Sequence, residues 1–260
     1  MSIYQNLALV TLFYETSEHH SDLRAALQGA GYTQNTHEAG HKLADQAFEL
    51  LARLAAPDHQ NDRSAAHLVH AASGEVEMWL QTVAARARRA GFEQPDLLVG
   101  AHLHGHDHAI SVMAQAQRAL GVLRSDEALR RSLGSERSVQ DLMLRGHTLL
   151  AKLERCANDA VHPDGSDARG KTQAQSAELE RWLKSAHQAA ERAFVGQARA
   201  FGMLGVVPLG AAPLGGAAGA VTLHAHAQRP GALPTPAPDP AGWSVGRQGR
   251  NRENPKNGYV

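Results

Sequence analysis

The spacing of apolar residues within long segments constrains the fold of this chain more than any other feature. Ala44, Phe48, Leu51 and Ala55 recur at steps of three and four residues, so they fall on one stripe of a helix. A second stripe runs through the next long segment and contains Val69, Ala72, Val76, Trp79, Leu80 and Val83. Aromatic residues make up only 5% of the chain, which favours closely packed helices over a β-sandwich. The sequence therefore predicts an all-α fold.

The helical pattern restarts after residue 108, and short matches link the two halves of the chain. Three matches recur at an offset of 103 to 106 residues, namely Glu77-Met78-Trp79-Leu80 with Glu180-Arg181-Trp182-Leu183, Gly40-His41 with Gly146-His147, and Pro57-Asp58 with Pro163-Asp164. A fourth match pairs Ser21-Asp22 with Ser125-Asp126. We interpret these matches as a duplicated three-helix unit.

The expected body is a six-helix bundle or stack built from a first unit, 1–91, and a second unit, 109–200. The expected helices lie at 3–20, 36–56, 64–90, 107–123, 136–160 and 172–200. A His-rich joint, 92–108, connects the two units. We expect residues 201–260 to form an apolar linker and a disordered basic tail, because Pro and Gly interrupt the apolar run and are abundant from there to residue 260.

Charge and cysteine content narrow the class of protein. Lys and Arg total 26 and Asp and Glu total 26, so no global field draws the body toward nucleic acid. The single cysteine, Cys156, excludes an internal disulfide, and the first residues lack the basic start of a signal peptide. We expect a cytoplasmic protein that binds a protein partner. Membrane contact through residues 200–223 is the less favoured interpretation.

Four histidines alternate with other residues in the joint: His102, His104, His106 and His108. In an extended loop their side chains could close on one ion, and in a helix His104 and His108 lie one turn apart. The stretch also resembles the H-x-H-x-D-H motif of metallo-β-lactamase-like hydrolases, but His106 breaks that spacing and no strand series is predicted. We expect either a solvated polar joint or a weak site for a divalent metal.

Residues 37–41 fit the pattern H-E-x-x-H, and over these five residues they resemble the motif of zinc peptidases. On a helix His37 and His41 lie one turn apart, and the resemblance implies that Glu38 acts as general base on a zinc-bound water. A catalytic zinc needs a third protein ligand. A hairpin that turns near residue 59 would place Glu77 opposite His41 and so supply it.

The same hairpin geometry predicts one His–Glu pair in each unit, His41 with Glu77 and His147 with Glu180. Each pair could be a polar contact that fixes the register of two helices. Alternatively, the two pairs converge as a metal site of two histidines and two carboxylates. The spacing Glu38-x-x-His41 also resembles that of ferritin-like di-iron helices, although the second unit lacks the glutamate.

The sequence favours a non-catalytic helical accessory protein that binds zinc or another divalent transition metal, or that supports resistance to metal or metalloid stress. The 16 histidines of the chain motivate this interpretation. Two alternatives stay open: a helical protein–protein interaction module, and an H-E-x-x-H zinc-dependent hydrolase with Glu38 as its catalytic residue. The candidate metal ligands are His37, His41, Glu77, His147, Glu180, His102, His104, His106 and His108.

Overall fold

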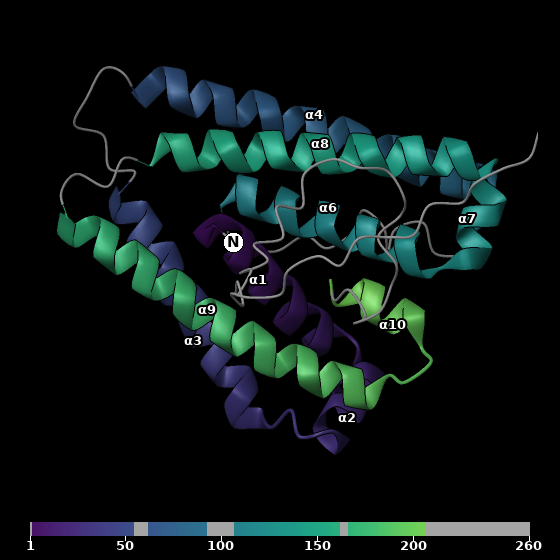
Figure 1. Ribbon diagram of the computed structural model, residues 1–260, viewed down its shortest axis with the longest axis horizontal. Coiled ribbons are helices and arrows are strands. Elements are labelled where there is room, and N and C mark those ends of the chain that lie inside the picture. The colour runs from purple at the N-terminus through teal and green to yellow at the C-terminus, as the bar shows by residue number, and fades with distance from the viewer. Residues whose placement is uncertain (1, 55–61, 93–106, 162–165, 206–260) are drawn as a thin grey trace, which may run out of the picture. The chain divides into compact units, whose positions relative to one another are not determined.

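The computed structural model describes residues 2–54, 62–92, 107–161 and 166–205, which form nine helices and no strand (Figure 1). The prediction of an all-α fold is confirmed. In chain order the helices are α1 (Ile3–His19), α2 (Ser21–Gly29), α3 (Gln34–Leu54), α4 (Asp62–Arg89), α6 (His108–Ser125), α7 (Glu127–Leu133), α8 (Glu136–Ala160), α9 (Ser166–Ala193) and α10 (Ala198–Met203).

The first helices of the two expected units form the centre of the core. Helix α1 contacts α3, α6 and α9, and α6 contacts α4, α8 and α10 as well as α1. Leu7, Val10 and Phe13 of α1 are fully buried, and so are Ala119 and Leu123 of α6. Helices that are apolar around most of their circumference belong inside a fold, where no face meets water.

The four longest helices pack around this centre in two pairs. Helix α4 runs beside α8, and α3 runs beside α9 (Figure 1). The sequence predicted hairpins within each unit, α3 with α4 and α8 with α9. The structure instead pairs the second helix of each expected unit with the third helix of the other, so side chains on α3 face α9 rather than α4.

In each pair of long helices, a tryptophan ring on one helix packs directly against a glycine on the other. The Trp79 indole donates a hydrogen bond to the Leu142 carbonyl at 3.0 Å, and a Cβ atom at Gly146 would lie within 3.0 Å of three Trp79 ring atoms. The glycine is therefore required by the ring that covers it. The second pair repeats this arrangement, with Trp182 donating to the Thr36 carbonyl at 2.7 Å and covering Gly40.

These two contacts join the residues that match between the halves of the sequence. They are what a duplicated unit would give if its third helix were exchanged with the other copy, and the duplication itself stays a prediction. Two short helices, α2 and α7, were not expected. Each begins at or directly after one of the matched Ser-Asp pairs, and the Asp126 carboxylate caps α7 by accepting from the Leu129 amide at 2.9 Å.

The end of the described chain packs on the body rather than leaving it. Gly196, with φ of 77°, turns the chain from α9 into α10. A Cβ atom at Gly202 would lie 2.7 Å from the carbonyl carbon of Gly121, so α10 meets α6 backbone to backbone. Phe201 and Leu204 are buried in the same contact. The expected boundary at residue 201 thus falls within α10, and the predicted tail beyond residue 205 lies outside the described residues.

Candidate metal centre

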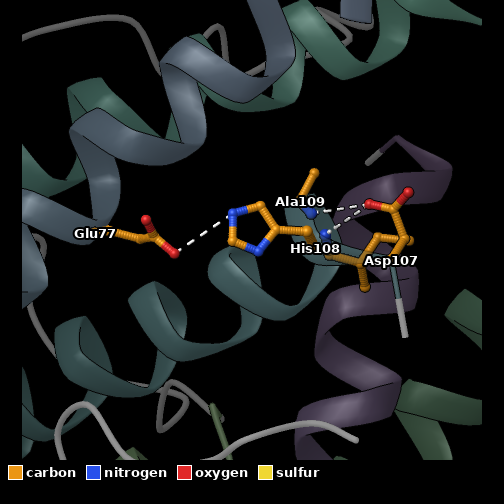
Figure 2. Close-up of polar contacts among 5 residues, drawn as sticks. Glu77, Asp107, His108 and Ala109 are labelled. Atoms are coloured by element: carbon orange, nitrogen blue, oxygen red, sulfur yellow. Dashed lines mark hydrogen bonds and ion pairs between the residues drawn. The ribbon is translucent and has the colours of Figure 1, made fainter. Parts of the chain in front are cut away.

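Glu77 and His108 come together where α4 passes the start of α6. The His108 Nε2 atom lies 3.4 Å from Glu77 Oε1, and Figure 2 shows the imidazole reaching from the first residue of α6 toward the carboxylate. The two side chains are 56% and 43% exposed, so solvent reaches both of them. Both residues were predicted as metal ligands from the sequence, but their contact was not.

The helix start that carries His108 is held by its own cap. Asp107 accepts hydrogen bonds from the backbone amides of Ala109 at 2.9 Å and Ile110 at 3.4 Å (Figure 2). A carboxylate at this position satisfies unpaired amides and suits the positive end of the helix dipole. Because Asp107 faces the helix end, the His108 ring is left to face Glu77 on the neighbouring helix.

A second histidine lies beside this pair. The His70 ring centroid is 6.3 Å from that of His108, with an angle of 40° between the rings. His70 precedes Glu77 by seven residues on α4, which is two helical turns and the same face. A zinc ion holds imidazole nitrogens at about 2.0–2.1 Å, and both rings are on exposed residues, so His70 is a candidate third ligand beside Glu77 and His108.

His70 was not predicted as a ligand, although the two-turn spacing before Glu77 could have revealed it. Within the part of the chain that the structure describes, no three His, Cys, Asp or Glu side chains already surround a common ion position. The junction therefore offers a formed carboxylate–imidazole pair with a third ligand nearby. Three of the candidate ligands, His102, His104 and His106, lie outside the described residues.

The H-E-x-x-H motif lies at the start of α3 with its two histidines in different surroundings. His37 is 7% exposed, and its Nδ1 atom lies 3.3 Å from the Tyr32 hydroxyl and 3.5 Å from that of Ser17. Burial, followed by the charge of Arg24, lowers the pKa of His37. This histidine is thus neutral and tied into the core.

The other two residues of that motif face solvent. His41 Nδ1 lies 3.0 Å from Asp45 Oδ2, and both side chains are 54% exposed. The Glu38 carboxylate accepts a hydrogen bond from the side-chain amide of Gln34 at 2.9 Å. His37 and His41 do occupy successive turns, as expected, but each already has a hydrogen-bonding or ionic partner on its Nδ1 atom.

The expected pairs His41–Glu77 and His147–Glu180 are replaced by other contacts. His41 pairs with Asp45, and Glu77 pairs with His108. His147 Nε2 lies 3.4 Å from Arg124 Nη2, and burial together with the Arg124 charge lowers its pKa. Glu180 belongs to α9, which packs on α1 and α3 rather than on α8. The expected pairs do not form because α4 packs on α8 and α3 packs on α9, rather than each within its own hairpin.

Comparison of the chain with protein-family models, curated proteins and solved structures gave no match. Among the helices that the structure describes, none combines the length and apolar character needed to cross a membrane. The function is therefore inferred from the side chains and their surroundings.

Proposed function

We propose that this protein is a non-catalytic accessory protein that binds a divalent transition metal, zinc in the first place, at the junction of α4 and α6. The contact between Glu77 and His108 carries the proposal, because it joins a carboxylate and an imidazole from two helices at the end of the His-rich joint. Imidazole and carboxylate are common zinc ligands, and His70 is near enough to serve as the third.

Metal binding at this place would act on the fold as well as on the ion. An ion held by Glu77 and His108 links α4 to α6, and a ligand that binds only the folded chain stabilises it. A proton competes with the metal for the same histidine nitrogen, so affinity should fall in acid. A protein that takes up metal in this way suits a role in tolerance of metal or metalloid stress.

Zinc titration of the full chain by calorimetry at pH 7.4 tests this proposal. The variants Glu77→Gln and His108→Gln each keep side-chain size while removing a ligand, and we expect each to weaken binding about tenfold or more. His41→Gln is the matched control, because His41 is similarly exposed and similarly paired with a carboxylate. Its zinc affinity should equal that of the wild type.

Two results would contradict the proposal. One is a wild-type chain that takes up no zinc, nickel or copper at micromolar metal. The other is a control variant, His41→Gln, that loses as much affinity as Glu77→Gln, because the zinc would then be bound elsewhere.

A second candidate function is that of a helical interaction module. Met78 and Leu144 are 62% and 64% exposed, and they adjoin the Trp79–Leu142 contact on the paired helices α4 and α8. Exposed apolar side chains on both helices of a pair could take part in a protein contact. A wild-type solution mass that rises with protein concentration would support this function, provided that the double variant Met78→Ser with Leu144→Ser stays monomeric.

The H-E-x-x-H hydrolase is the least supported alternative. Its first histidine is buried against Tyr32 and Ser17, and its second is paired with Asp45. Hydrolysis that disappears in Glu38→Gln while zinc stays bound would be the observation in its favour.

A further inference from the structure

A cavity of about 380 Å³ lies between the end of α4, helix α7 and helix α10. This volume is in the range of small-molecule sites, about 300–1,000 Å³. Phe92 and Ala128 supply apolar surface, and Asp126, Ser132 and Arg199 supply polar groups. None of these residues belongs to the proposed metal site.

Several acceptor groups line the cavity beside the Arg199 cation. The Asp126 side chain is only 13% exposed, and it accepts from the Leu129 amide at 2.9 Å. Ser132 donates its hydroxyl proton to the Leu129 carbonyl at 2.7 Å, which leaves the oxygen lone pairs for another donor. The carboxyl end of α4 reaches the cavity at Ala90, and this end of a helix carries negative potential. Together these groups favour a cation.

The chain already places a cation at the mouth of the cavity. The Arg199 guanidinium lies 5.2 Å from the centroid of the Phe92 ring, in a cation–π arrangement. Its Nε atom is 4.0 Å from Asp126 Oδ2, which is an ion pair too long to be a hydrogen bond. The Arg199 side chain is 47% exposed, so an outside cation could displace it.

We propose that this cavity binds a small organic cation, an alkyl amine or alkyl guanidine. Its head group takes the place of the Arg199 guanidinium between Phe92 and Asp126, and its alkyl stem contacts Ala128. The largely buried Asp126 carboxylate attracts the cation, and the Phe92 ring adds a face that attracts cations.

Butylamine and butylguanidine are the probes, and butyrate is the matched anion of similar size. With the full chain, we expect a saturable rise in melting temperature with both cations and none with butyrate. Asp126→Asn removes the charge but keeps a good helix cap, and it should weaken cation binding about tenfold or more. Asp107→Asn, the same change at the cap of α6, should leave cation binding unchanged.

The variant Arg199→Ala gives the proposal its sharpest test. Removal of the internal competitor should tighten butylamine binding about threefold or more. This variant leaves Asp126 and the α7 cap intact, so it remains informative if Asp126→Asn does not fold. The proposal is overturned if neither cation binds saturably at millimolar concentration, if Asp126→Asn binds as tightly as wild type, or if butyrate binds and is lost in Arg199→Ala.

Discussion

The α3–α9 and α4–α8 pairs share a tryptophan–glycine contact but differ in the residues that surround it. Trp182 lies on Gly40 beside the rings of Phe13 and Tyr32, with centroid distances of 5.7 and 6.2 Å. Trp79 lies on Gly146, where Met143 and Leu144 take the positions of His37 and Glu38, so the H-E-x-x-H motif is incomplete on α8. The tryptophan–glycine contact therefore occurs in both helix pairs, whereas the complete H-E-x-x-H motif occurs only on α3.

The two halves of the chain also differ at the proposed metal site. With the offset that matches Ser21 to Ser125, His108 corresponds to Tyr4, and with the offset that matches Trp79 to Trp182, Glu77 corresponds to Glu180. Tyr4 is 8% exposed, so one half of the molecule has a buried phenol where the other has an accessible imidazole. Of these two matched places in the described chain, the α4–α6 junction is therefore the one with a carboxylate–imidazole pair.

The largest effect should come from removing either tryptophan. Trp79→Ala and Trp182→Ala should each lower the free energy of unfolding by about 3–5 kcal/mol, because each empties a buried site and loses an indole hydrogen bond. Trp182→Ala also loses edge-on contacts with Phe13 and Tyr32, worth about 0.5–1.5 kcal/mol more. Urea unfolding at pH 7 measures the difference, and a larger loss for Trp79→Ala would reverse this ranking of the two pairs.

The next largest effect should be a pH dependence of the unfolding free energy. It arises beside the α3–α9 pair, where the rings of Phe13, Tyr32 and Trp182 lie together. His187 of α9 lies 6.2 Å from the Phe13 ring, and burial lowers its pKa to about 4. The matched position on α4 is Ala84, which cannot titrate. Since the unfolded pKa is near 6.5, the unfolded chain binds the proton first, and stability present above pH 6.5 is lost as the pH falls toward 4.

That loss should amount to about 3 kcal/mol at most for this group. His187→Leu should flatten the decline in unfolding free energy between pH 6.5 and pH 4. An unchanged slope in His187→Leu would mean that the remaining histidines with lowered pKa values, His20, His37 and His147, dominate the acid sensitivity.

The smallest of the three effects should be nearly equal in the two halves. Gly40→Ala and Gly146→Ala each push a methyl group into an indole ring, and we expect each to cost about 1–3 kcal/mol in unfolding free energy. Gly74→Ala on α4 is the control, because a Cβ atom there meets nothing within 4 Å and alanine favours the helix. A thermal unfolding series in which Gly74→Ala is as damaging as the other two would remove the special role of these contacts.

Local patterns predicted the long helices well, and they failed where the fold depends on distant contacts. The stripe through Trp79 and Val83 is a property of neighbouring residues, so the helix could be predicted without knowing its partner. The pairing of α4 with α8 depends on an indole that fits a glycine 67 residues away, which no local pattern indicates. Helices α2 and α7 are 9 and 7 residues long, too short for a clear periodic stripe.

The candidate site shows the same limit. Glu77 and His108 could be named from the sequence because carboxylates and histidines are metal-ligand types, but their partnership could not. The prediction that His41 is the partner of Glu77 depends on a hairpin of α3 with α4. In the structure α4 packs on α8 instead. The cap by Asp107, which presents His108 to α4, is also readable only once the start of α6 is known.

The metal content of the chain tests the central claim most directly. The full-length protein would be dialysed to equilibrium against micromolar zinc and analysed for zinc and protein, beside the double variant Glu77→Gln with His108→Gln. We predict about one zinc ion per wild-type chain at the α4–α6 junction and a clear loss of that ion in the double variant. A wild-type chain without zinc, or a double variant that holds as much zinc as the wild type, would contradict the proposed metal site.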